Sequence, residues 1–189
     1  MAELLPGLRL DPERVPKGRL RLEIGFGGGE HLAHQADLHR DVMFIGAEPF
    51  VNGVAKLLAL IEAGDLRNIL IHDGDAREVL AALPAGGVEC IYLLYPDPWP
   101  KARHQRRRFV NAETLADFHR LLPPGGEFRF ASDIADYVDW TRAAVAEHGG
   151  FTETGDPLAA FPGWIETRYE AKAKREGRDS RYLTLLRTG

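Results

Sequence analysis

Short apolar runs alternate with amphipathic segments along nearly the whole chain. The apolar runs are rich in Val, Ile, Leu, Phe and Tyr, which is typical of buried strands. They lie at 19–25, 42–47, 68–72, 88–95, 126–131 and 181–186. Between them, apolar residues recur at the helical spacing i, i+3, i+4 in the segments 50–64, 76–83, 109–122 and 134–149. We therefore expect strands and helices to take turns along the chain.

This alternation predicts a fold class. Parallel strands need long crossover connections, which are usually helices, so the pattern predicts a doubly wound α/β fold with a mostly parallel sheet. Gly64 and Gly149 are placed to end helices, and the Pro-Pro-Gly-Gly sequence at 123–126 predicts a tight turn before the fifth strand. The run at 181–186 is expected to add a strand whose direction the pattern leaves open.

The length of 189 residues, 44% of them hydrophobic, suits one domain. We expect residues 19–189 to form it and residues 1–18 to form an N-terminal segment, ordered or disordered. No apolar run approaches the roughly 18–20 residues that span a bilayer, and the N-terminus lacks a signal-peptide pattern, so we expect a cytoplasmic protein with no membrane partner. The single cysteine, Cys90, lies in an apolar run and is expected to be buried and unreactive.

Acidic residues end most of the predicted strands. They are Glu23 in the first run, Glu48 after the second, Asp73 and Asp75 after the third, Asp97 after the fourth and Asp133 after the fifth. Ligands of open α/β sheets bind outside the carboxyl ends of the strands. A group of carboxylates at one such edge is costly unless a cationic or donor-rich ligand lies among them. The sequence therefore predicts a positively charged ligand at this edge.

The glycine-rich loop at 25–29 distinguishes between cofactors. The dinucleotide fingerprint G-x-G-x-x-G fails, because Glu30 stands where the third glycine is required after Gly25 and Gly27. The acids would also repel a pyrophosphate. S-adenosylmethionine carries a sulfonium, an ammonium, one carboxylate and no phosphate, so acidic walls suit it.

Each loop and acid position then has an expected partner on S-adenosylmethionine. The methionine part is expected to lie against the loop glycines Gly25, Gly27 and Gly29. Its ammonium is expected near Glu23, the ribose hydroxyls near Glu48, and the adenine amino group near Asp75.

The fourth predicted strand runs into a segment with three alternating prolines, at 95–101. Proline bars both helix and ladder pairing, so we expect a stiff extended loop that orients Asp97, Trp99 and Lys101. Trp99 offers a flat face on which a purine could stack. A packing contact is as common for tryptophan, and both interpretations stay open.

A run of positive charge follows directly. Residues 101–108 hold five Lys or Arg and no acid, although the whole chain has a net charge of −4. Such a run is usually a solvated helix face. Here it is contiguous and adjoins the predicted cofactor crevice, which favours contact with a phosphate backbone. A second basic excess at 166–178 fits a solvent-exposed helix, and the pattern assigns it no function.

These residues resemble a known family, the bacterial tRNA (guanine-N7)-methyltransferases. The similarity extends from Glu23 to Arg181, and its most specific element is PDPWPKARHQRRR at 96–108. LEIGFGGGEH, GDAREVL, Ser-Asp at 132–133 and TRYE at 167–170 support it. The family commonly has TKFE where this chain has TRYE, and Lys where this chain has Arg in the basic run. The resemblance implies a Rossmann-like class I S-adenosylmethionine-dependent methyltransferase fold and, as substrate, guanosine 46 of the tRNA variable loop.

The resemblance also implies roles for individual residues. The cofactor site would include Glu23, Glu48, Asp75 and Asp97, with Asp97 as the catalytic residue. The substrate-binding positions would be Lys101, Asp133, Thr167, Arg168, Tyr169 and Glu170. The RNA-contacting positions would be Arg103, His104, Arg106, Arg107 and Arg108.

Other functions remain open at this point. A methyltransferase acting on another RNA or on a small molecule would carry the same crevice, and a non-catalytic RNA-binding module would carry the same basic run. A metal enzyme is disfavoured, because His31 and His34 are three residues apart with no further ligand in pattern. The protein is expected to be a monomer or a homodimer.

Overall fold

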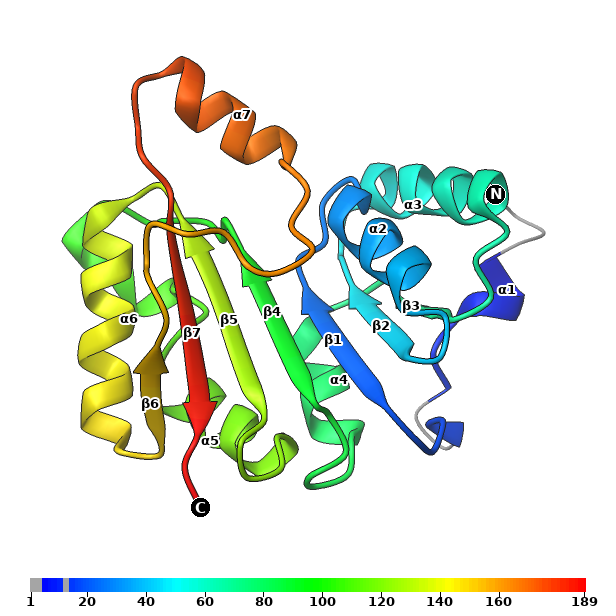
Figure 1. Ribbon diagram of the computed structural model, residues 1–189, viewed down its shortest axis with the longest axis horizontal. Coiled ribbons are helices and arrows are strands. Elements are labelled where there is room, and N and C mark those ends of the chain that lie inside the picture. Colours follow the sequence, from blue (N-terminus) through cyan, green and yellow to red (C-terminus); the bar gives the residue numbers. More distant parts are fainter. Residues whose placement is uncertain (1–4, 12–13) are drawn as a thin grey trace.

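The computed structural model describes residues 5–11 and 14–189. A single sheet runs through the molecule, with helices on both of its faces (Figure 1). Its strand order is β3-β2-β1-β4-β5-β7-β6. The order reverses between β1 and β4, and at such a switch point the loops leave in opposite directions and open a crevice for a ligand.

The parallel part of the sheet matches the predicted runs. It consists of β1 (Leu20–Ile24), β2 (Met43–Ala47), β3 (Ile69–His72), β4 (Cys90–Leu94) and β5 (Glu127–Ser132). The final run forms β7 (Arg181–Arg187), which pairs antiparallel with β5. The expected doubly wound, mostly parallel α/β fold is thus confirmed.

One edge strand was not predicted. β6 (Phe151–Thr154) pairs antiparallel with β7 at the end of the sheet. Of its four residues only Phe151 is buried, and the other three are exposed. A strand this short with a single buried apolar residue gives no apolar run in the sequence, which is why β6 was not predicted.

The helices connect the strands in the predicted alternation. They are α1 (Leu5–Leu8), α2 (Glu30–Leu38), α3 (Val51–Gly64), α4 (Ala76–Ala82), the 3-10 helix η2 (Ala102–Arg107), α5 (Ala112–Leu121), α6 (Ala135–His148) and α7 (Arg168–Arg175). Gly149 ends α6 in the left-handed conformation, as predicted. α3 ends at Gly64, as predicted, although Asp65 and not the glycine takes the left-handed position. Asparagine and aspartate tolerate that conformation better than other residues with side chains.

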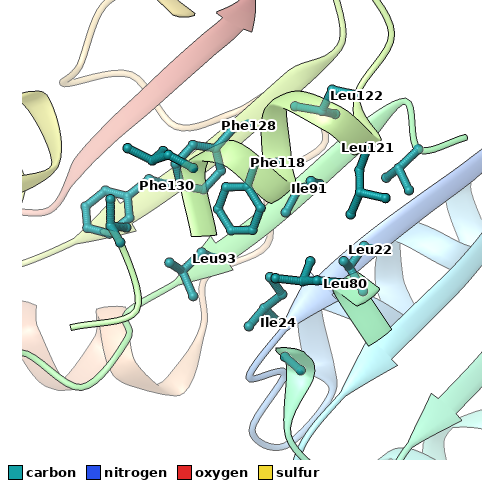
Figure 2. Close-up of a cluster of buried hydrophobic side chains, with 14 of the residues drawn as sticks. Leu22, Ile24, Leu80, Ile91, Leu93, Phe118, Leu121, Leu122, Phe128 and Phe130 are labelled. Carbon is teal, nitrogen blue, oxygen red and sulfur yellow. The ribbon is translucent and has the colours of Figure 1, made fainter. Parts of the chain in front are cut away.

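Two apolar layers hold the helices on the sheet. Figure 2 shows the larger one, where α4 and α5 pack on the central strands. Its labelled members are Leu22, Ile24, Leu80, Ile91, Leu93, Phe118, Leu121, Leu122, Phe128 and Phe130. On the other face, α2 and α3 bury Leu32, Leu57 and Leu58 against Phe44 and Ile71. Because helices cover both faces of the sheet, a ligand can reach the parallel strands at their carboxyl ends.

The described part of the N-terminal segment contacts the domain. Arg9 forms a parallel bridge with Ile71 on β3, and the Leu10 side chain is 5% exposed. Residues 1–4 and 12–13 of the predicted segment 1–18 lie outside the described residues. The division of the chain at residue 18 stays a prediction. In the described residues, no helix has the length and apolar character needed to cross a membrane.

Burial makes Cys90 a probe of the folded state. Its side chain lies in β4, and burial raises the pKa of the thiol to about 12. Because the thiolate is the reactive form, we expect iodoacetamide near pH 8 to leave Cys90 unmodified in the native protein and to alkylate it in denaturant. Mass spectrometry reads both states. Rapid alkylation of the native protein would contradict the buried placement.

Candidate active site

A cavity of about 370 Å³ opens at the carboxyl ends of the central strands. This volume lies within the range of about 300–1,000 Å³ that small-molecule sites occupy. The ends of β1, β2 and β4, the start of α4 and the loop after β4 supply its walls. They contribute Gly25, Gly27, Glu48, Asp75 and Asp97, the five predicted cofactor residues that the structure brings together here.

Glu48 organises the glycine loop. One carboxylate oxygen accepts a hydrogen bond from the Gly27 backbone N–H at 2.7 Å, and the other accepts from the Phe50 N–H at 3.0 Å. The side chain is only 4% exposed. Gly27 has a φ of 58°, a conformation that favours glycine. The loop N–H that a pyrophosphate would need is thus bound to a carboxylate, which argues against a dinucleotide on chemical grounds.

Asp75 lies at the N-terminus of α4 and caps this helix. Its side chain accepts a hydrogen bond from the Arg77 backbone N–H at 2.9 Å, and the Arg77 guanidinium lies 3.2 Å from the other carboxylate oxygen. Arg77 also lies over the Phe109 ring, 5.0 Å from its centroid. Both Arg77 and Phe109 line the cavity, so Asp75 is held in place from two sides.

Asp97 lies between two residues with strained backbone. Tyr95 has a φ of 50° and Trp99 a φ of 42°, values that residues with large side chains rarely adopt. Such outliers persist where the surrounding structure holds them, commonly at functional sites. The expected proline loop is therefore present, with a left-handed residue near each end. Among the described residues, the Asp97 carboxylate forms no ion pair and no hydrogen bond.

Trp99 contacts the basic helix η2 as well as the cavity. The Arg107 guanidinium lies over its ring at 4.9 Å from the centroid, and His104 meets it edge-on at 6.1 Å. Both Trp99 and Arg107 line the cavity. Trp99 therefore anchors the proline loop on η2 and also borders the cavity.

Glu23 and Gly29 do not line this cavity, so their predicted contacts with the cofactor stay predictions. Glu23 is 3% exposed, and its carboxylate lies 2.6 Å from Nδ1 of His31. It lines a smaller cavity of about 20 Å³ that shares Gly25, Tyr95 and Tyr169 with the larger one. A Cβ at Gly29 would meet Leu57 of α3 at 2.8 Å, so this glycine permits helix packing. The sequence does not reveal His31 as the partner of Glu23, although the eight-residue separation across a strand and the next helix is compatible with it.

The TRYE segment divides between the cavity and the protein interior. Tyr169 lines the cavity, and its ring stacks on Tyr95 at 6.5 Å between centroids. Arg168 is exposed next to the Gly27 loop. Thr167 is 8% exposed and caps α7 by accepting from the Glu170 N–H at 3.2 Å.

Glu170 is bound inside the protein. Its carboxylate accepts hydrogen bonds from Trp164 Nε1 at 2.6 Å and from the Tyr182 hydroxyl at 2.8 Å, and it pairs with Lys174 at 2.8 Å. Burial works to raise the pKa of Glu170, but the hydrogen bonds from Lys174, Tyr182 and Trp164 hold this pKa below its usual value. The carboxylate therefore fixes α7 on the sheet and does not line the cavity, which its predicted role in substrate binding would require.

Asp133 and Lys101 are not cavity residues in this structure. Asp133 has a side chain that is 13% exposed and pairs with Arg178 at 2.6 Å. Lys101 is exposed at the N-terminal end of η2. Their predicted contact with substrate stays a prediction.

The basic run separates into exposed and buried members. Arg103, Arg106 and Arg107 are exposed on η2, and His104 is partly exposed. Arg108 departs from the prediction, because its side chain is 0% exposed.

The Arg108 guanidinium is held by the protein itself. It donates to the Pro98 carbonyl at 3.0 Å and to the Asp136 carboxylate, and lies 4.8 Å and 5.1 Å from the ring centroids of Tyr137 and Trp140. It therefore fixes the proline loop on α6, and its buried side chain is not available for the predicted contact with RNA.

Arg108→Ala is expected to lower the free energy of unfolding by about 2–4 kcal/mol, because it empties a packed site and leaves the Pro98 carbonyl without its donor. Urea unfolding measures this change. The matched control is Arg106→Ala, an exposed arginine of the adjoining helix η2, which should stay within about 0.5 kcal/mol of the wild type. Equal stability of the two variants would contradict a structural role for Arg108.

Most strand-end acids have a partner within the protein. Glu23 pairs with His31, Asp73 with Arg9, and Asp133 with Arg178. Glu48 and Asp75 accept backbone hydrogen bonds. These acids are therefore largely compensated by the protein and do not together require a cationic ligand. Within the described residues, Asp97 is the strand-end acid that keeps a free carboxylate in the cavity.

Several cavity residues were missed by sequence reasoning. Phe50, Pro96, Arg77 and Phe109 line it. Arg77 lies within the GDAREVL sequence, which was the available signal, whereas apolar residues such as Phe50 look like ordinary helix positions. In the described residues, no group of three or more His, Cys, Asp or Glu side chains is arranged to hold a metal ion.

Known proteins match the chain over nearly its whole length. A family model described as "Putative methyltransferase" matches residues 17–183. The tRNA (guanine-N(7)-)-methyltransferase of Agrobacterium fabrum is 53% identical, over 97% of this chain and 86% of its own length. The protein of the same name from Rhizobium meliloti is 52% identical, over 99% of this chain and 87% of its own length.

Solved structures support the fold. The 16S rRNA methyltransferase KamB has a TM-score of 0.65 at 17% identity, covering 92% of this chain and 89% of its own. Precorrin-6y C5,15-methyltransferase from Geobacter metallireducens has a TM-score of 0.59 at 12% identity, covering 93% and 85%. At such low identity the likeness shows a shared class I methyltransferase fold and nothing about substrate.

Proposed function

The chain belongs to the tRNA (guanine-N7)-methyltransferase family, and from this premise we propose that it methylates N7 of guanosine 46 in the tRNA variable loop. It is an S-adenosylmethionine-dependent enzyme that acts on tRNA. The position of the guanosine is the finer part of the proposal. Because tRNA is the substrate, we also propose that the enzyme acts in the cytoplasm.

The residues that line the cavity fit S-adenosylmethionine. Glu48 is buried at the end of β2, where a carboxylate can accept ribose hydroxyls, and it already occupies the loop N–H that a phosphate would need. Gly25 and Gly27 keep the wall near β1 free of side chains. Asp75 offers an acceptor at the opening of α4. We propose that these four residues hold the cofactor, with Asp97 facing it.

The methyl transfer needs no acid or base catalysis by the protein. The bound cofactor supplies a methyl group on a sulfonium, so the N7–carbon bond forms as the sulfur–carbon bond breaks. Guanine N7 carries no proton, and no base has to remove one. The protein contributes by aligning the base and by placing negative charge where the purine becomes positive.

Asp97 is suited to both tasks. Its carboxylate is free of protein partners and lines the cavity, and its backbone lies between the left-handed residues Tyr95 and Trp99. We propose that it accepts a hydrogen bond from the guanine edge and stabilises the positive charge that develops on the ring. The Tyr169 ring, stacked on Tyr95, borders the same space and is placed to limit the orientation of the base.

RNA contact is assigned to the exposed members of η2. Arg103, Arg106 and Arg107 form no ion pair within the described residues, and Arg107 reaches the cavity. Arginine pairs with phosphate in a two-pronged geometry, so these side chains are suited to the backbone beside the target base.

The free carboxylate of Asp97 in the cavity is the observation that carries the proposal. The test incubates the protein with tRNA transcripts and isotope-labelled methyl donor, and maps the modified nucleotide by mass spectrometry. We expect 7-methylguanosine at position 46 and no labelling when that guanosine is replaced by adenosine. Labelling at another guanosine would contradict the assigned position, and labelling of free guanosine alone would contradict tRNA as substrate.

A further inference from the structure

Helix α7 carries a row of basic side chains on one face. Arg168, Lys172 and Arg175 follow at spacings of four and three residues, which places them along a single side of an α-helix. All three are exposed. Glu170 and Ala173, on another side of the helix, are 3% and 0% exposed. The helix is thus anchored by one face and presents a basic face to solvent.

The row lacks ion-pair partners, although Glu176 acts on it at longer range: the hydrogen bond from Arg178 and, to a smaller extent, the charges of Lys172 and Arg175 lower the pKa of Glu176. None of its three members forms an ion pair with the residues that the structure describes, whereas neighbouring bases do. Lys174 is bound by Glu166 and Glu170, and Arg178 by Asp133 and Glu176. The paired bases hold the helix in position. The unpaired ones are left for a ligand.

The basic row begins at the cavity. A terminal nitrogen of Arg168 lies 3.1 Å from where a Cβ on Gly27 would be, and the next residue, Tyr169, lines the cavity wall. In Figure 1, α7 lies beyond the carboxyl ends of β4 and β5. From Arg168 to Arg175 the helix rises about 10 Å, against about 3.4 Å per nucleotide along a helical strand, so the row is long enough for more than one phosphate.

A second basic element reaches the same cavity from a distant part of the chain. Arg107 of η2 lines it together with Trp99, and the exposed Arg103 and Arg106 extend away from it. Unpaired positive charge therefore meets the cavity rim from two separate helices. A nucleotide entering the cavity has flanking strand on both its 5′ and 3′ sides, and both must pass this rim.

We propose that Arg168, Lys172 and Arg175 form a second contact surface for the tRNA backbone, distinct from η2. The inference rests on the proposed tRNA substrate. It assigns the flanking phosphates on one side of the target guanosine to α7 and those on the other side to η2. The basic excess at 166–178 thereby divides into a structural part and a binding part.

The test is the double variant Lys172→Gln/Arg175→Gln, which leaves the cavity residues unchanged. We expect the Kd for an unmodified tRNA transcript to rise at least about tenfold, and the slope of log Kd against log salt concentration to fall by about 1 per removed charge. Calorimetric affinity for S-adenosylmethionine should not change.

Two controls separate a local contact from a general effect of charge. Arg40→Gln/Arg67→Gln removes the same charge near the starts of β2 and β3, at the opposite edge of the sheet, and should leave the Kd for tRNA near that of the wild type. Lys172→Arg/Arg175→Lys keeps the charge and should bind tRNA almost normally.

Three outcomes would overturn the inference, and a fourth would overturn the proposed function. An unchanged Kd in the glutamine variant, or a rise matched by Arg40→Gln/Arg67→Gln, overturns the inference. So does an equal rise in the charge-keeping variant. Failure of the wild-type protein to methylate tRNA overturns the proposed function itself, so the two failures are distinguishable.

Discussion

Asp97→Asn should lower kcat for tRNA methylation by about 10²–10³-fold at saturating cofactor and tRNA. The substitution keeps the shape of the side chain but removes its negative charge. Since that charge is proposed to oppose the positive charge developing on guanine, the loss falls on the transition state and added cofactor does not restore the rate. Single-turnover transfer of a labelled methyl group measures this directly.

The control for Asp97 is another carboxylate on the surface. Asp139 is exposed on α6, and Asp139→Asn should methylate at the wild-type rate. The pH profile adds a second readout, because a residue that takes no proton from N7 predicts no requirement for a base near neutral pH. Full methylation by Asp97→Asn at saturating cofactor would contradict the proposed role.

Gly53→Ala should weaken cofactor binding, although Gly53 itself does not line the cavity. A Cβ at this position of α3 would lie 2.2 Å from the Gly27 carbonyl oxygen and 3.0 Å from Cγ of Glu48. Neither atom can give way without moving the loop. Overpacking of this kind costs about 1–3 kcal/mol, so we expect a lower urea midpoint and at least about a tenfold loss of affinity for S-adenosylmethionine.

Gly7→Ala is the matched control. A Cβ on Gly7 of α1 would meet nothing within 4 Å, and the residue has an ordinary helical backbone. This substitution should leave stability unchanged or raise it by up to about 1 kcal/mol, since alanine favours a helix over glycine. If Gly53→Ala behaved like Gly7→Ala in urea and in calorimetry, the close approach of α3 to the glycine loop would be wrong.

The sequence was sufficient for the architecture because the parallel strands are buried on both faces. Strands such as β4 then read as continuous apolar runs, and the helices between them keep a clear period. β6 could not be found this way, since an edge strand with one buried residue lacks that signal. The direction of β7 was equally inaccessible, because an apolar run is the same in either direction.

The site was predicted less completely, because the sequence does not show which partners its charged side chains contact. Sequence position placed Glu48 and Asp97 at the carboxyl edge, and the structure agrees. It did not reveal that Glu23 faces His31, or that Arg108 turns inward onto Tyr137. Neither partner follows from the sequence pattern, so a charge in the sequence looks free until the fold shows what it pairs with.

The central claim is that the cavity directs N7 of a tRNA guanine to the methyl donor. The most direct test uses a tRNA transcript made with 7-deazaguanosine, in which a C–H group replaces N7 and the nucleophilic lone pair is lost. We predict that this transcript competes with ordinary tRNA for the enzyme but accepts no methyl group. Methylation of the 7-deaza transcript at the rate of ordinary tRNA would contradict the claim.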